Sequence, residues 1–229
     1  LKTLEGGGSA LIPVFAMGKT QELLTMLHKF KESGRIPEKT PVFIGGLSTK
    51  MTILFDEFAD TTPRQMPGFQ IFRDMDVRAA SKKGSRKPVV YQPGAIYALS
   101  SGMMTEKTIS NGFAHGFISN PKNSLLFVGY AAPDSPAGAI RASKQGDVIE
   151  LSPDLTPVQF NCDMKIFDFS GHSDREALLA YMLKVAPRKM FLVHGDIGAS
   201  EWFRDQLAEK LPDCDVIIPE PKKIYDLDQ

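Results

Sequence analysis

Two histidines stand where apolar strands turn into helices. His172 lies in FDFSGHSDREALL, residues 167–179, and His194 lies in FLVHGDIGASEWF, residues 191–203. A neutral imidazole at the end of a strand is a good zinc ligand, and an imidazole beside a helix amino terminus can pass a proton to a phosphate oxygen. The alternative is that each ring only satisfies hydrogen bonds at a strand end. The shared placement predicts one site at one edge of a sheet.

The residues after each histidine fit such a site. Asp196 follows His194 by two positions and could orient a metal-bound group through a hydrogen bond. Ser173 and Glu176 form the S-x-x-E pattern of a capping box, so we expect Ser173 to cap the helix after His172. Free N–H groups and the helix dipole favour anions at that point, which suits a phosphate.

The remaining chain alternates apolar strands with helices. Leu11–Phe15 has the composition of a buried strand, and apolar residues recur at helical spacing after Thr20. The same rhythm returns near AIYALSSGMM, where Ser100 and Ser101 occupy the turn after a strand. Repeated β-α units predict an α/β fold with a largely parallel sheet flanked by helices.

Other stretches depart from that rhythm. Residues 61–88 are polar and predict a loop, and residues 146–151 and 158–170 alternate as an antiparallel pair does. APDSPAG breaks the pattern near residue 140, which predicts a domain boundary there. The polar loop contains a run of basic residues without an acid, which is either a solvated surface or a phosphate contact. These residues are Arg78, Lys82, Lys83, Arg86 and Lys87.

Composition excludes several classes of protein. The 229 residues carry 27 basic and 27 acidic side chains, so binding of nucleic acid by bulk positive charge is excluded. No apolar run approaches the ~20 residues needed to cross a bilayer, and the two cysteines form no C-x-x-C motif. We therefore expect a cytoplasmic protein without a membrane contact, a disulfide framework or a thiol-rich zinc site. AMGKT is not a phosphate-binding loop, because Pro13 stands where its first glycine belongs.

Taken together, the motifs resemble the β-CASP branch of the metallo-β-lactamase fold, which includes ribonuclease J and the endonuclease that cuts pre-mRNA 3′ ends. The segments S-G-H-S-D and V-H-G-D resemble motifs B and C of that family. The resemblance continues through most of the chain in family order. It includes ALIPVFAMGKTQELL, PVFIGGLSTKMT, YALSSGMMTEKTISN and KNSLLFVGYAAPDSPAG.

The resemblance implies roles for individual residues. His194 corresponds to a zinc ligand, and His172 corresponds to the histidine that approaches the scissile phosphate and assists the leaving group. Asp174 corresponds to the aspartate of motif B, a neighbour of the metal ligands. Family members bind two zinc ions and hydrolyse RNA by two-metal catalysis. Ser100, Ser101 and the basic residues 82, 83, 86 and 87 are then candidate RNA contacts.

The resemblance also implies two domains with different functions. Residues 1–140 correspond to the β-CASP domain, which clamps nucleic acid, and residues 141–229 to the carboxyl-terminal part of a metallo-β-lactamase αββα domain. The family's H-x-H-x-D-H ligands are missing, so we expect this chain alone to be inactive and to need an amino-terminal half. Without that half, exposed sheet surface predicts self-association, such as a homo-oligomer. The alternative function is a catalytically silent subunit that binds RNA or a partner protein.

Overall fold

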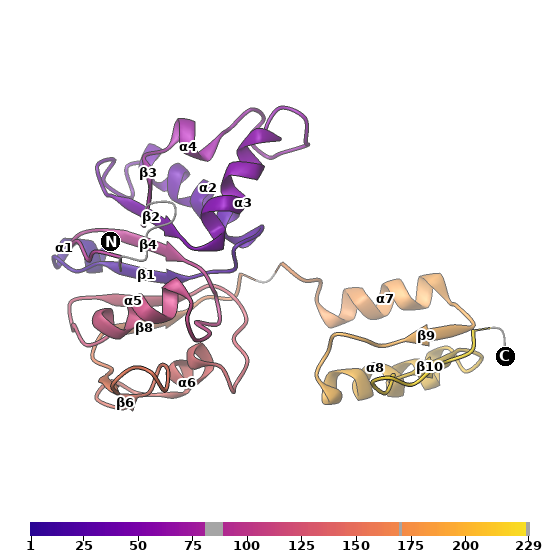
Figure 1. Ribbon diagram of the computed structural model, residues 1–229. Coiled ribbons are helices and arrows are strands. Elements are labelled where there is room, and N and C mark those ends of the chain that lie inside the picture. The colour runs from indigo at the N-terminus through magenta and orange to yellow at the C-terminus, as the bar shows by residue number, and fades with distance from the viewer. Residues whose placement is uncertain (81–88, 170, 228–229) are drawn as a thin grey trace. The chain divides into compact units, whose positions relative to one another are not determined.

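The chain forms two compact units, Leu1–Ser170 and Gly171–Gln229. The computed structural model describes residues 1–80, 89–169 and 171–227, and each unit is considered by itself (Figure 1). The prediction of domains at 1–140 and 141–229 concerns the family's domains and stays a prediction. The compact units divide later, because the strand Asp163–Ile166 pairs with the sheet of the first unit.

The first unit is built on a six-stranded parallel sheet, in the order β3-β2-β4-β1-β5-β8. The prediction of a parallel sheet flanked by helices is therefore confirmed. Each strand has only three or four residues, and the register is continuous from Val42 through Ile96 and Ala10 to Ser124. The strands are β1 (Ala10–Pro13), β2 (Val42–Gly45), β3 (Val77–Ala79), β4 (Ile96–Leu99), β5 (Ser124–Phe127) and β8 (Asp163–Ile166).

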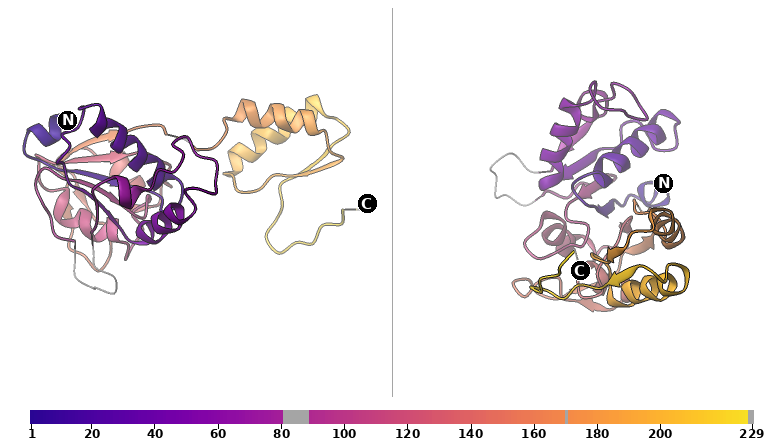
Figure 2. Two further views of the ribbon diagram at one scale, coloured as in Figure 1. Left: turned by 90° about the horizontal axis from the view of Figure 1, so that it is seen from above. Right: turned by 90° about the vertical axis from the view of Figure 1, so that its right-hand side faces the viewer.

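Helices cover both faces of this sheet, as two further views show (Figure 2). Alternate residues of one strand point to opposite faces, so Leu11 packs in one core and Ile12 in the other. The first core lies under α5 and α6, and the second lies under α2 and α4. The helices are α1 (Lys2–Glu5), α2 (Lys19–Glu32), α3 (Leu47–Glu57), α4 (Ile71–Asp74), α5 (Ile109–Phe117) and α6 (Pro136–Ala142).

The region predicted to be antiparallel divides between two sheets. The strands β6 (Val148–Ile149) and β7 (Val158–Gln159) form an antiparallel pair, as predicted. The next strand, β8, instead joins the main sheet parallel to β5. It lies at the sheet edge and its side chains are mostly exposed, so its sequence alternates although its pairing is parallel.

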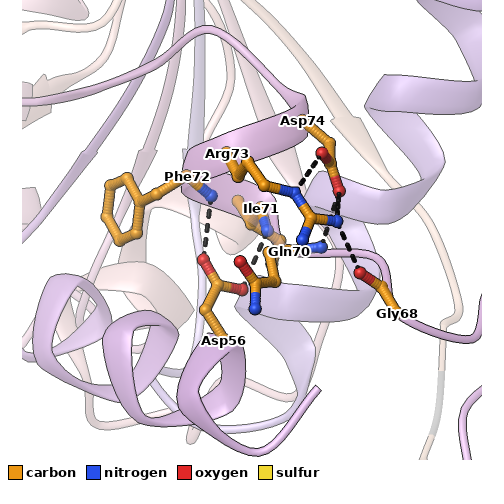
Figure 3. A network of polar contacts seen from close by, with 7 residues as sticks. All are labelled: Asp56, Gly68, Gln70, Ile71, Phe72, Arg73 and Asp74. Atoms are coloured by element: carbon orange, nitrogen blue, oxygen red, sulfur yellow. Dashed lines mark hydrogen bonds and ion pairs between the residues drawn. The ribbon is translucent and has the colours of Figure 1, made fainter. Parts of the chain in front are cut away.

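The segment 61–88, predicted as a loop, contains α4 and the edge strand β3. A polar network fastens α4 to α3 (Figure 3). The Asp56 carboxylate accepts hydrogen bonds from the backbone N–H groups of Ile71 and Phe72, each at 2.8 Å. Beside it, the guanidinium of Arg73 donates to Asp74 and lowers the pKa of that carboxyl to about 2.

Replacing Asp56 by alanine is expected to destabilise the first unit by about 1–2 kcal/mol, because the carboxylate caps the amino terminus of α4 from another helix. Urea unfolding followed by circular dichroism measures the change. Glu57→Ala is the matched control, since Glu57 is the next residue of α3 and is exposed. Equal unfolding free energies for the two variants would mean that the cap contributes nothing.

The second unit is smaller and has one parallel strand pair. Its helices α7 and α8 contact each other, and α8 contacts β10. Among the described residues of the chain, no helix is both long and apolar enough to span a membrane. The elements of this unit are α7 (Arg175–Val185), β9 (Lys189–Phe191), α8 (Ile197–Lys210) and β10 (Asp215–Ile217).

Candidate functional site

His194 lies just beyond β9 in the second unit. Leu192 continues the strand by donating its N–H to the carbonyl of Ile217 at 2.9 Å. The chain then turns at His194, whose φ of 63° lies in the left-handed region. A residue with a Cβ rarely adopts this conformation, although histidine does so more often than most. The turn leaves the residue exposed between the strand and α8.

His172 lies three residues before α7 and is exposed. The capping-box pattern predicted Ser173 as the helix cap, but the cap is Asp174. The Asp174 carboxylate accepts a hydrogen bond from the N–H of Ala177 at 2.7 Å, and Glu176 pairs with Arg175 at 2.8 Å. Aspartate is favoured over serine at this position because it caps a helix equally well and also places a negative charge at the positive end of the helix dipole.

The two histidines lie at the same end of the second unit. The chain runs along α7 and returns along β9, so the end of β9 comes back to the beginning of α7 (Figure 1). Asp196 is the N-cap residue of α8, which starts at this end too. The guanidinium of Arg175 lies 4.9 Å from the ring centre of Trp202, which joins the first turn of α7 to α8. Two helix amino termini thus accompany the histidines, and such termini favour anions.

Arg175 and Trp202 were not among the predicted site residues. The signal for them is weak, because an arginine at the start of a helix and a tryptophan inside another share no motif. Their stacking supports the relative position of the two helices. Arg175 directly follows Asp174 in the sequence, so its positive charge lies at the start of α7.

The described residues contain no group of three histidine, cysteine or acidic side chains that could hold a metal ion. A catalytic zinc ion takes about three protein ligands. The residues 171–227 therefore do not make a zinc site by themselves. His194 can supply one ligand to a site whose other ligands come from outside the described residues.

The first unit has a second candidate surface, at the carboxyl edge of its parallel sheet. The connection after β1 leads to α2 on one face, and that after β4 leads to α5 on the other. Ligands of open α/β sheets bind where neighbouring connections diverge in this way. Lys19 begins α2 at this edge, with its ammonium 2.6 Å from the Glu22 carboxylate.

The two predicted serines at this edge differ in what their hydroxyls do. Ser100 is only 6% exposed and donates to the carbonyl of Gly45 at 3.0 Å. Ser101 is partly exposed, and its hydroxyl lies 3.0 Å from that of Thr105. Ser101 is therefore the one that a ligand can reach. The basic candidates Lys82, Lys83, Arg86 and Lys87 lie outside the described residues, whereas Arg78 pairs with Asp76 at 2.8 Å.

The other two histidines of the chain make contacts within the first unit. The ring of His28 lies 4.7 Å from that of Phe69. The Nε2 atom of His115 lies 2.9 Å from the carbonyl oxygen of Thr156. Both contacts fasten one element of the unit to another.

Comparison with known proteins connects both units to one family. A model described as "Beta-Casp domain" matches residues 20–140. A model described as "Zn-dependent metallo-hydrolase RNA specificity domain" matches residues 157–219. The second match covers His172, His194 and the elements that position them.

Individual relatives match most of this chain. "Transcription termination factor FttA" of Methanosarcina mazei is 32% identical over an alignment of 225 positions, which covers 91% of this chain and 34% of the relative. "Integrator complex subunit 11" of Danio rerio is 26% identical over 91% of this chain and 34% of its own length. "RNase J-like protein" of Methanocaldococcus jannaschii is 24% identical over 85% of this chain and 45% of its own length.

The chain spans about a third of the length of the first relatives that it matches. The two family models follow each other in this chain, on the units that carry the parallel sheet and the two exposed histidines. The chain therefore belongs to the β-CASP family of metallo-β-lactamase-fold proteins, a family of zinc-dependent metallo-hydrolases that process RNA.

Proposed function

We propose that this chain is part of a zinc-dependent ribonuclease that hydrolyses RNA phosphodiester bonds. The observation that carries the proposal is the arrangement of His172 and His194. Both are exposed at one end of the unit that the RNA-specificity model matches. Because both residues are exposed, a metal ion or a phosphate group can reach them.

The two histidines have different roles in this proposal. A ring nitrogen of His194 would coordinate a zinc ion, and the left-handed turn holds this residue beyond the end of β9. His172 delivers a proton to the leaving-group oxygen of the scissile phosphodiester, next to the amino terminus of α7. Asp174 fixes that terminus through its bond to Ala177, and Asp196 neighbours the zinc ligand in the chain.

The zinc site itself needs a further part of the protein. The described residues lack a group of three ligands, and α7 buries none of its residues. Apolar side chains are exposed on α7, such as Tyr181 at 67%, and after β9, such as Val193 at 69%. An amino-terminal half would supply the other ligands and cover this surface. The chain without it is inactive and tends to self-associate.

The first unit contributes RNA binding. Its carboxyl sheet edge presents Ser101 and the start of α2, where backbone N–H groups favour phosphate. The basic residues 82, 83, 86 and 87 follow β3 in the sequence and would add phosphate contacts. This unit therefore acts as a clamp for RNA.

A catalytically silent subunit is the second candidate function. Two observations favour it: the described residues make no metal group by themselves, and one relative is named as the subunit of a complex. Such a protein would bind RNA or a partner without cutting. Its histidines would then have no chemical role, and their replacement would change nothing.

The test compares two polypeptides with a labelled RNA. A longer polypeptide that includes the amino-terminal half is expected to cut the RNA with zinc present and to stop after chelation. The chain of 229 residues is expected to leave the RNA intact under the same conditions. Firm RNA binding without cleavage by the longer, zinc-loaded polypeptide would reject the nuclease and favour the silent subunit.

A further inference from the structure

The helix α3 of the first unit has its polar and apolar residues reversed. Its fully buried residues are Ser48 and Thr52, which are polar. Ser48 donates its hydroxyl to the carbonyl of Gly45 at 2.7 Å, and Thr52 accepts a hydrogen bond from the side-chain amide of Gln21 at 2.9 Å. None of the residues 47–57, all of which the structure describes, belongs to either hydrophobic core. Hydrogen bonds, rather than core packing, therefore attach this helix to its unit.

The apolar residues of α3 point outward instead. Four of them form the α3 stripe, which consists of Leu47, Met51, Leu54 and the C-cap residue Phe58. Leu47, Leu54 and Phe58 are 55%, 45% and 56% exposed, and Met51 is partly buried. Their spacing of four, three and four residues is that of a coiled-coil seam, in which apolar residues face a second helix. A buried polar row and an exposed apolar stripe on one helix indicate a contact surface.

The α3 stripe lies apart from the contacts that α3 makes within its unit. Ser48, Thr52 and Asp56 follow each other at intervals of four residues, so they lie along one row of the helix. This row bonds to β2, α2 and α4. The stripe begins one residue earlier, at Leu47, about 100° round the helix from Ser48. Its exposed side chains are therefore accessible to another polypeptide.

Two charged residues flank the stripe. Lys50 and Glu57 are both exposed and lie seven residues apart, so they occupy equivalent positions in two successive repeats of the stripe. In an antiparallel helix pair, Lys50 of one copy lies beside Glu57 of the other, and the two-fold axis repeats this pair. In a parallel pair, equal positions lie at the same height, and the two opposite charges stay about 10 Å apart along the axis. The stripe is thus complementary to itself in the antiparallel arrangement.

We propose that two copies of this chain pair through the α3 stripe, with their α3 helices antiparallel across a two-fold axis. Leu47 then faces Phe58 of the second copy, and Met51 faces Leu54 of the second copy. A contact between identical chains across a two-fold axis uses the same patch twice, so that patch has to be self-complementary. The two flanking charges meet this condition, which favours a second copy over an unrelated partner. The inference concerns the first unit alone and does not depend on the proposed ribonuclease activity.

The size of this contact sets the expected affinity. α3 has 11 residues, which is about three turns. Such a helix pair buries less than the ~800 Å² per partner that stable interfaces bury. We therefore expect a weak dimer, with a Kd of about 10 µM or above. At lower concentrations the chain is monomeric, so the unfolding comparison of Asp56→Ala with Glu57→Ala is made there.

Sedimentation velocity over a range of concentrations measures this dimer in the chain of 229 residues. Leu54→Lys puts a charge in the middle of the stripe and is expected to raise the Kd by at least ~10-fold. Ile53→Lys is the matched control. Ile53 precedes Leu54 and is 46% exposed, against 45% for Leu54, but it lies outside the stripe. The Ile53→Lys chain is expected to dimerise as the unchanged chain does.

The flanking charges test the antiparallel arrangement. Lys50→Glu and Glu57→Lys each replace two attractive pairs by two repulsive ones, so each alone is expected to weaken the dimer by about 10-fold at low salt. A mixture of the two variants restores both pairs, as does the double variant, and each is expected to dimerise nearly as well as the unchanged chain. Both positions are exposed, so this test stands even if Leu54→Lys fails to fold. A mixture that stays monomeric would reject the antiparallel pairing.

Three further outcomes would overturn the inference. The first is a chain that stays monomeric, or one in which Leu54→Lys dimerises as well as Ile53→Lys. The second is association that Tyr181→Lys on α7 abolishes, which would assign it to the exposed surface of the second unit. The third is a longer polypeptide with the amino-terminal half that stays monomeric where this chain dimerises, which would assign the stripe to a contact within the longer protein. None of these measurements uses RNA or zinc, so they are independent of the proposed nuclease function.

Discussion

Replacing His194 by asparagine in a polypeptide that carries the amino-terminal half is expected to remove zinc and activity together. Asparagine tolerates the left-handed backbone that His194 adopts, so the turn after β9 keeps its shape while the imidazole is lost. Alanine is a poorer choice, because it has no polar side-chain group to hydrogen-bond locally in this conformation. Even residues that only support zinc ligands contribute about 10–100-fold to metal affinity, so the loss of a ligand should exceed ~100-fold.

The measurement is zinc content by atomic emission beside the rate of RNA cleavage, at a fixed free zinc concentration. His28→Asn is the control, because His28 packs against Phe69 in the other unit. Cleavage should fall in proportion to the zinc lost. A His194→Asn protein with full zinc occupancy would take this residue out of the metal shell.

The parallel sheet could be predicted because its central strands are short apolar runs bounded by helices of clear periodicity. Leu11 is fully buried, as its segment predicted. The strand β3 could not be found in this way. It has three residues, none of them buried, and it pairs with β2 only at the sheet edge. Its place depends on Asp56, which holds α4 from 15 residues earlier in the chain. No local pattern carries that information.

The start of a helix after each of the two histidines could be predicted, but the surroundings of the histidines could not. His194 follows β9 closely, as predicted, whereas the strand before His172, β8, ends at Ile166 and pairs in the sheet of the first unit. The two strands therefore belong to different sheets, which no local pattern indicates. The choice of Asp174 over Ser173 as the helix cap could not be predicted, because both residue types are favoured at the N-cap position. The burial of the Ser100 hydroxyl against Gly45 depends on β2 and β4 being neighbours, a contact between residues 55 positions apart.

Replacing His172 by glutamine is expected to slow cleavage by about 100-fold or more while zinc stays bound. Glutamine keeps polar atoms at the position but cannot release a proton near neutral pH. His172 lies outside β9 and α8, which hold His194, so the proposed zinc ligand stays in place. His115→Gln is the control, because the ring of His115 bonds to Thr156 in the other unit.

The pH profile separates a proton donor from a residue that only shapes the site. A general acid works while it is protonated, so the rate falls as the pH rises through its pKa. In His172→Gln that fall is expected to disappear, and the variant should lose more activity at low pH than at high pH. An RNA with a better leaving group should recover much of the lost rate, because it needs less help from a proton. An unchanged profile, or an equal loss with both substrates, would leave His172 with a structural role next to α7.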